Sequence, residues 1–133
     1  MKVLFICRAN VGRSQAAMEL YRQLGGVADS AGTRVDEPGQ LLMNRPAAAT
    51  IVRVMQNEYG IDMSHNVRIQ ATPSMAAAYD KLVVMAEPET IPTWLAQDVR
   101  TELWTVPDPA GKTERETSST VRDIAQKVAS IRG

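Results

Sequence analysis

The sequence predicts an α/β fold: a doubly wound, four-stranded parallel sheet with helices on both faces. Continuous apolar runs, typical of strands buried on both faces, alternate along the chain with segments of helical period. Parallel strands require crossover connections, and the segments between the runs supply them as helices. With 133 residues, 44% of them hydrophobic, the chain has the size of one globular domain, so we expect a single domain over residues 1–133.

The first half of the chain is divided by glycine and proline. Gly25 and Gly26 end a predicted helix, Pro46 begins another, and Gly60 ends it. Polar, turn-rich residues between these helices predict a mobile surface loop. The expected elements are a strand over 3–6, a helix from about 14 to 24, a strand over 27–31, the loop over 34–44 and a helix over 46–59.

The second half repeats the alternation. Thr72 and Pro73 have the character of an N-cap and a first helical residue. The expected elements are a short helix from there to about residue 79, a strand over 82–86, a short helix around 92–97, a strand over 103–106 and a last helix whose inner face is formed by Val121, Ile124, Ala125, Val128 and Ile131. Because folds of this class bind ligands beyond the carboxyl ends of their strands, the loops after Ile6 and Val106 are expected to meet at a site.

The segment from Cys7 to Ser14 joins a buried strand to a helix. Backbone N–H groups and the positive end of the helix therefore converge on one point and form an anion site. A thiol there loses its proton more readily, and Arg13 can grip two phosphate oxygens at once. The alternative is a buried structural cysteine beside a surface arginine. The expected phosphate-binding residues are Arg8, Ala9, Asn10, Val11, Gly12, Arg13 and Ser14.

Asp108 is a candidate proton donor. It stands between Pro107 and Pro109, which restrict the backbone on both sides. A carboxyl group held rigidly over an anion site could protonate a leaving oxygen. The alternative is a plain turn, since Asp-Pro followed by Ala-Gly is common in turns.

The chain resembles the low-molecular-weight protein tyrosine phosphatases and the arsenate reductases of the same fold. The resemblance covers nearly the whole chain, and its motifs are the Cys-x5-Arg-Ser loop with Asn10 inside it, Ser30-Ala31-Gly32-Thr33, Gly60-Ile61-Asp62, Tyr79-Asp80 and Val106-Pro107-Asp108-Pro109. It implies a phosphotyrosine phosphatase I-like fold in which Cys7 is the nucleophile, Arg13 binds the transferred phosphate and Asp108 is the acid. It also implies that Asn10 and Ser14 shape the loop, with Ser14 donating a hydrogen bond to the thiolate.

Two further supporting residues follow from the resemblance. Ser30 belongs to one of the shared motifs, and His65 resembles a position that braces the loop through Asn10. For His65 an exposed loop histidine is an equal alternative. Glu87 and Glu89 follow the third predicted strand, and we expect both to be solvated.

The chain departs from the family pattern at two places that affect function. Gly12 stands where many relatives have a second cysteine, and Ala110-Gly111 stand where tyrosine phosphatases of higher organisms have aromatic residues. The expected function is a cysteine-dependent phosphatase that hydrolyses phosphate monoesters through a thiophosphate intermediate, with phosphotyrosine in proteins as one candidate substrate. The alternatives are an arsenate reductase that uses an external small thiol or a glutaredoxin-type partner, and a non-catalytic module that binds a phosphorylated ligand.

Composition limits the partners and the compartment. The formal net charge is zero, from 15 basic and 15 acidic residues, which argues against binding nucleic acid or membrane through bulk charge. The single cysteine and the lack of a secretory leader fit a reducing cytoplasm. One cysteine and one histidine give no zinc-ligand spacing, and no metal or organic cofactor is implied. The expected partner is a phosphorylated protein or small molecule, and the oligomeric state is left open.

Overall fold

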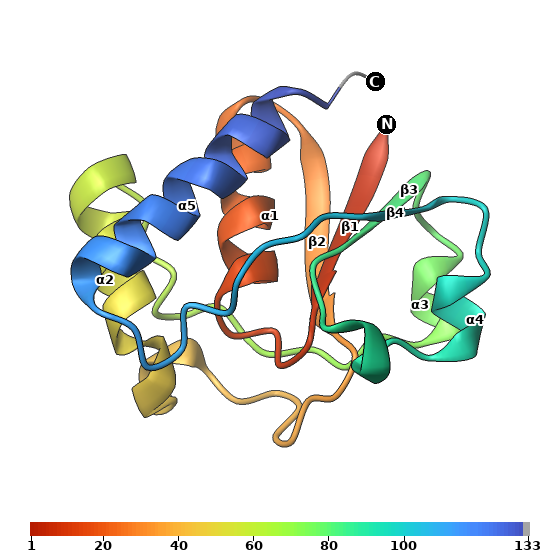
Figure 1. Ribbon diagram of the computed structural model, residues 1–133, viewed down its shortest axis with the longest axis horizontal. Coiled ribbons are helices and arrows are strands. Elements are labelled where there is room, and N and C mark those ends of the chain that lie inside the picture. Colours follow the sequence, from red (N-terminus) through yellow and green to blue (C-terminus); the bar gives the residue numbers. More distant parts are fainter. Residues whose placement is uncertain (132–133) are drawn as a thin grey trace.

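The computed structural model describes residues 1–131 and contains a four-stranded parallel sheet (Figure 1). The strands are β1 (Lys2–Cys7), β2 (Val27–Gly32), β3 (Lys81–Val84) and β4 (Thr101–Leu103). Their order is β2-β1-β3-β4, and each neighbouring pair is parallel. The predicted fold class is confirmed.

Helices cover both faces of the sheet (Figure 1). The helices are α1 (Arg13–Gln23), α2 (Ala49–Tyr59), α3 (Pro73–Ala76), α4 (Thr93–Ala96) and α5 (Glu114–Ala129), and the 3-10 turns are η1 (Leu42–Asn44), η2 (Pro46–Ala48) and η3 (Pro88–Thr90). The long helices α1, α2 and α5 pack on one face, and the short helices α3 and α4 pack on the other. No helix within residues 1–131 is long and apolar enough to cross a membrane.

Strand β1 is the centre of the core, because its side chains alternate between the two layers. Val3, Phe5 and Cys7 face the long helices, whereas Leu4 and Ile6 face the short ones. All five are almost completely buried, as the continuous apolar run predicts. The strand that ends in Cys7 is therefore fixed by packing on both faces and by hydrogen bonds on both edges.

The last strand is shifted from its predicted position. We expected 103–106, but β4 comprises Thr101–Leu103 and lies at the edge of the sheet. Glu102 and Leu103 are exposed, so an apolar run does not mark this strand. The backbone N–H of Trp104 still donates to the carbonyl of Val84 in β3 at 2.9 Å, after which the chain leaves the sheet, and Val106 is buried beside the phosphate loop. Strand β3 also ends earlier than expected, at Val84 instead of residue 86.

The segment over 34–44, predicted to be a mobile surface loop, is tied to the body of the protein. The backbone N–H of Gly39 donates to the carbonyl of Arg68 at 2.7 Å, and that of Leu42 donates to the carbonyl of Asn66 at 2.9 Å. Leu42 is buried in the core, which explains why the segment packs down despite its polar sequence. Pro46 begins the turn η2 instead of α2, which starts at Ala49.

Candidate active site

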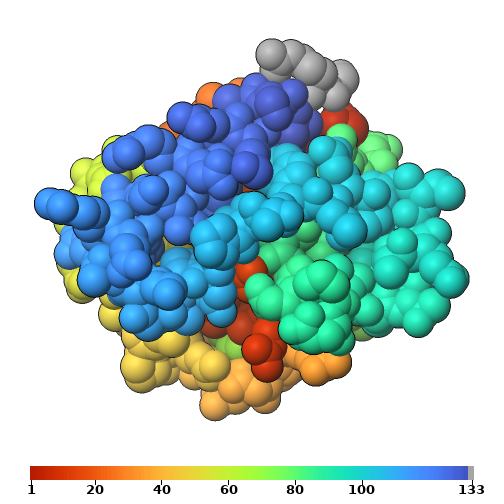
Figure 2. Space-filling view, in the orientation of Figure 1, coloured from red at the N-terminus to blue at the C-terminus, as the bar shows by residue number. Residues whose placement is uncertain are grey.

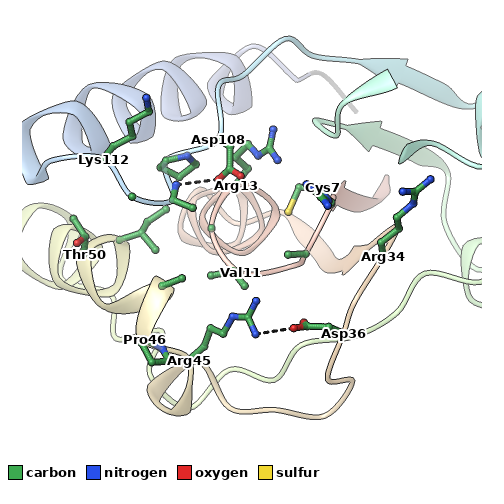
Figure 3. Close-up of a pocket in the computed structure, with 18 residues that line it drawn as sticks. Cys7, Val11, Arg13, Arg34, Asp36, Arg45, Pro46, Thr50, Asp108 and Lys112 are labelled. Carbon is green, nitrogen blue, oxygen red and sulfur yellow. Dashed lines mark hydrogen bonds and ion pairs between the residues drawn. The ribbon is translucent and has the colours of Figure 1, made fainter. Parts of the chain in front are cut away.

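The phosphate loop runs from the last residue of β1 to the first residue of α1. Gly12 is the N-cap of α1, and no side chain caps the helix. The N–H groups of its first turn are thus open to an anion, and the positive end of the helix dipole points the same way. The loop forms the floor of a cavity of about 530 Å³ (Figure 3). Figure 2 shows loop atoms, in red, in a recess between later parts of the chain.

Asn10 holds the loop in shape. Its backbone has a φ of 55°, in the left-handed region that few residues other than glycine adopt. Its amide nitrogen donates to the hydroxyl oxygens of Ser14 at 2.8 Å and Ser30 at 3.0 Å. Its amide oxygen accepts from the backbone N–H of Ile69 at 2.8 Å and from the side chain of Gln15 at 3.2 Å. Every hydrogen-bonding position of this buried amide is used, which offsets the strain of its backbone.

The thiol of Cys7 faces the hydroxyl of Ser14, with 3.0 Å between Sγ and Oγ. Because the Ser14 oxygen accepts a hydrogen bond from the Asn10 amide, its own hydroxyl proton is free to point at the sulfur. Both side chains are buried. A hydrogen bond in this direction stabilises a sulfur anion, which is the contact that the resemblance implied for Ser14.

Gly32 lets the loop lie close against the end of β2. A β-carbon at this position would come within 2.7 Å of the carbonyl oxygen of Arg8 and within 2.9 Å of the backbone nitrogen of Asn10. Both contacts are with backbone, which cannot move aside without moving the loop. The close approach explains the glycine in the Ser30-Ala31-Gly32-Thr33 motif.

Arg13 is held from outside the loop by Glu87 and Val106. Its Nη1 donates to Glu87 Oε2 at 2.8 Å and to the carbonyl of Val106 at 3.0 Å, and its Nη2 donates to Glu87 Oε1 at 3.1 Å. Of the five guanidinium N–H groups, the Nε–H and one Nη2–H have no protein partner among residues 1–131. These two form one edge of the guanidinium, the edge suited to two oxygens of a phosphate.

The ion pair between Arg13 and Glu87 keeps both groups charged. Burial lowers the pKa of Arg13, but the hydrogen bond to Glu87 and the negative charges of Cys7, Glu87 and Asp108 more than offset this, and the pKa is raised. The same hydrogen bond lowers the pKa of Glu87. The prediction that Glu87 is simply solvated is wrong, because its carboxylate accepts two hydrogen bonds from Arg13. Glu89 is exposed, as predicted.

His65 does not brace the loop. Its side chain is 76% exposed and lies near Asp62, and its Nδ1 is 3.2 Å from the hydroxyl of the adjacent Ser64. Asn10, the expected partner, is already saturated by Gln15 and by the backbone of Ile69. The alternative of an exposed loop histidine is the correct one, and Gln15 does the bracing predicted for His65.

Arg68 is a residue of the site that sequence reasoning missed. Its side chain is fully buried behind the loop and donates to the carbonyl of Ala9 from Nε at 3.1 Å and from Nη2 at 2.9 Å. The same guanidinium donates to Gln40 at 2.8 Å and to Asp36 at 2.6 Å. The hydrogen bonds from Arg68 and Arg45 hold the pKa of Asp36 far below its ordinary value. By binding the carbonyl of Ala9 from behind the loop, Arg68 turns that carbonyl away from the anion site.

Asp108 lies across the cavity from the loop (Figure 3). Its Oδ1 accepts from the backbone N–H of Ala110 at 3.0 Å, so the turn predicted as the alternative is present as well. Cys7 and Asp108 line the same cavity. The neighbouring Pro109 packs so closely against Gly12 that a β-carbon on Gly12 would lie 3.2 Å from its ring.

The cavity contains no aromatic side chain among the residues that the structure describes. Its walls are formed by the small or aliphatic residues Val11, Ala47, Ile51, Pro109 and Ala110, with cationic side chains around them. Over residues 1–131 no group of three or more His, Cys, Asp or Glu side chains is arranged to hold a metal ion. The cationic side chains of the cavity are thus suited to an anionic ligand.

A buried thiol before the uncapped N-terminus of a helix, beside a guanidinium with a free edge, is the arrangement of the class of cysteine-dependent phosphatases. Residues 2–131 match the family described as low molecular weight phosphotyrosine protein phosphatase, and the chain belongs to this family. The family consists of phosphoric monoester hydrolases.

Solved structures share the fold of this chain. A low molecular weight protein tyrosine phosphatase from T. tengcongensis is 22% identical, with a TM-score of 0.81 over 97% of this chain and 95% of that one. Wzb from Vibrio vulnificus, in complex with benzylphosphonate, is 22% identical, with a TM-score of 0.80 over 96% and 94%. An arsenate reductase in the phosphate binding state is 25% identical, with a TM-score of 0.76 over 96% and 93%. No curated protein of similar sequence was found.

Proposed function

We propose that this protein hydrolyses phosphate monoesters with Cys7 as the nucleophile, Arg13 as the phosphate clamp and Asp108 as the proton donor. The observation that supports this most strongly is the free edge of the Arg13 guanidinium, since Glu87 and Val106 occupy its other donors. A residue held in this way is ready to bind two phosphate oxygens without further rearrangement. A module that only binds phosphate needs neither a thiol nor a carboxyl over the anion.

In the first step the Cys7 thiolate attacks phosphorus in line, and the bond between phosphorus and the ester oxygen breaks. Asp108, protonated, gives its proton to that oxygen, so the alcohol or phenol departs neutral. The loop N–H groups and Arg13 stabilise the equatorial oxygens during the transfer. The hydrogen bond from Ser14 stabilises the sulfur anion before the attack.

In the second step water hydrolyses the thiophosphate. The Asp108 carboxylate takes a proton from the water, a phosphorus–oxygen bond forms, and the phosphorus–sulfur bond breaks. Inorganic phosphate leaves, and Cys7 returns as the thiolate. The cycle needs only water, which supports hydrolysis without a cofactor. A nucleophile that must stay reduced also supports a cytoplasmic location. The partner in the proposed reaction is a phosphorylated protein or small molecule.

Arsenate reduction is the second candidate, because an arsenate reductase is among the similar structures. Reduction requires two electrons from thiols, and the chain has one cysteine. A cysteine in place of Gly12 would also crowd Pro109. An external thiol would therefore have to resolve any adduct on Cys7.

A paired assay separates the two functions. Phosphate release from an aryl phosphate is measured with nothing added, and arsenite formation from arsenate is measured with thioredoxin, a glutaredoxin system or a small thiol in turn. We expect phosphate release and no arsenite with thioredoxin as the only reductant. Rapid arsenite formation with a small thiol, without hydrolysis of the aryl phosphate, would replace the phosphatase by a reductase.

A further inference from the structure

The charged residues around the cavity are unevenly distributed. Although the whole chain has no net charge, the cavity is lined by five cationic side chains and two carboxylates. The cationic residues are Arg8, Arg13, Arg34, Arg45 and Lys112, and the carboxylates are Asp36 and Asp108. One cation, Arg13, suffices to clamp a phosphate. The others make the mouth of the cavity attractive to further negative charge.

Apart from Arg13, Arg45 is the one cation among the described residues lining the cavity that is not exposed. It lies between the turns η1 and η2, and its backbone is restricted by Pro46, which follows it. Its Nη1 donates to Asp36 Oδ2 at 2.9 Å, and its side chain is only 27% exposed. In Figure 3 its guanidinium points from the lower wall toward the phosphate loop, near Val11. The side chain is thus positioned before any ligand arrives.

Asp36 does not cancel the charge of Arg45, because it is shared with a second arginine. Its other oxygen, Oδ1, accepts from Arg68 at 2.6 Å. Arg68 is fully buried and holds the carbonyl of Ala9 in the phosphate loop. Two guanidinium groups therefore share one carboxylate, so the group as a whole remains positive. It also connects Arg45 to the phosphate loop through Asp36 and Arg68.

The apolar walls of the cavity carry no aromatic side chain that could stack on a ring of the substrate. Val11, Ile51 and Pro109 present aliphatic surface, and Ala110 is small. Selectivity for a substrate must therefore come from the polar groups at the mouth. Arg34 also donates a hydrogen bond, to the carbonyl of Glu89 at 3.2 Å, but it is exposed, whereas Arg45 is partly buried and paired with Asp36.

We propose that Arg45 receives a second anionic group of the substrate, so that the substrate class is a phosphate monoester bearing a further carboxylate or phosphate. This inference rests on the proposed hydrolysis at Cys7. In the complex, the ester phosphate lies in the loop against Arg13, and the second anion accepts hydrogen bonds from the guanidinium nitrogens of Arg45 that Asp36 leaves free.

The test compares phenyl phosphate with 4-carboxyphenyl phosphate, which differ by one anionic group. We expect the wild type to prefer the carboxylated substrate in kcat/KM, and Arg45→Gln to reduce that preference about tenfold, as expected for one charge-assisted hydrogen bond. Arg45→Lys keeps the charge and should keep most of the preference. Arg122→Gln, which removes an exposed arginine of α5 outside the cavity, is the matched control and should leave both rates unchanged.

Binding measurements test the second anion site independently of the proposed hydrolysis. Phenylphosphonate and 4-phosphonobenzoate cannot be hydrolysed, and calorimetry measures their affinities in the same variants. Turnover of both esters with no preference, and no effect of Arg45→Gln, would overturn the second anion site and leave the hydrolase intact. No turnover of either ester, with tighter binding of 4-phosphonobenzoate that depends on Arg45, would contradict the hydrolase function and support the second anion site.

A third comparison identifies the source of the second anion. Phosphotyrosine peptides with aspartate next to the phosphorylated residue are compared with the same peptides carrying asparagine there. A preference for the acidic peptides that is lost in Arg45→Gln indicates a protein substrate. Preference for the carboxylated small ester alone indicates a small molecule with two anionic groups. An absence of preference in both comparisons contradicts the proposal.

Discussion

Replacing Glu87 by alanine tests whether the clamp on Arg13 matters for catalysis. The change removes two hydrogen bonds, at 2.8 and 3.1 Å, and with them the one carboxylate within residues 1–131 that binds the Arg13 guanidinium, which is 3% exposed. Val106 alone then restrains the side chain through its carbonyl at 3.0 Å. Hydrogen bonds between charged groups contribute roughly 1.5–3 kcal/mol each in buried sites. Because the Glu87 side chain is 35% exposed, water replaces part of this, and we expect a loss of about 1–2 kcal/mol in the free energy of unfolding.

The catalytic effect should exceed the structural one. A guanidinium free to rotate no longer presents its Nε and Nη2 edge to the phosphate, and misplacement of a clamping group costs about 10- to 100-fold in rate. We expect kcat/KM for an aryl phosphate to fall by about that factor, and the affinity for inorganic phosphate to fall with it. Glu89→Ala removes an exposed neighbouring carboxylate and serves as the control. Equal kcat/KM in Glu87→Ala and wild type would refute the clamp.

The ion pair between Arg13 and Glu87 makes the stability of the protein depend on pH in the acid range. Since the hydrogen bond from Arg13 lowers the pKa of Glu87 below its ordinary value of 4.5, the stabilisation by this pair is fully present above pH 4.5. It is lost only as the pH falls through the lowered pKa of the folded protein. Thermal unfolding between pH 3 and pH 6 should show a smaller loss of stability with acid in Glu87→Ala than in the wild type. Parallel curves would contradict the assignment.

Three further substitutions test the remaining parts of the site. Cys7→Ser should abolish phosphate release yet still bind inorganic phosphate in calorimetry; surviving turnover would end the nucleophile assignment. Asp108→Asn should lower kcat by roughly 10²–10⁴, less for esters with acidic leaving groups, whereas an equal loss across leaving groups means that Asp108 only supports its loop. Gly32→Ala should destabilise the protein by about 1–3 kcal/mol and lower kcat/KM, because its β-carbon meets the backbone of Arg8 and Asn10; an unchanged melting temperature would show that the loop tolerates the displacement.

The fold and the centre of the site could be predicted because they depend on local patterns. The apolar run of β1 fixes a strand buried on both faces, and the residue after it must stand at the carboxyl end of a central strand. Cys7 and the anion-binding helix end follow from that placement. The edge strand β4 was displaced in the prediction because exposure, not hydrophobicity, characterises it. A pattern based on burial finds central strands and misplaces edge strands.

The residues that surround the loop could not be predicted from spacing alone. Glu87 and Arg68 are 74 and 55 positions from Arg13, and only the sheet order brings the ends of β1 and β3 together. His65 is predicted from the resemblance, but Gln15, in the first turn of α1, already satisfies Asn10. A charged residue just after the strand adjacent to β1 was the available signal for Glu87, because parallel neighbours end at the same edge of the sheet.

The phosphate loop is held in shape by residues that lie far apart in the sequence. The left-handed backbone of Asn10 is unfavourable by itself and is held by groups from β2, α1 and the segment before α3. Arg68 holds the loop from behind, and Glu87, in the segment after β3, holds Arg13. The Nε–H and the second Nη2–H of Arg13 take no part in these restraints. An incoming anion can therefore bind them without breaking a contact between Arg13 and the protein. The loop is therefore shaped by folding before substrate binds, and binding energy remains available for the transfer step.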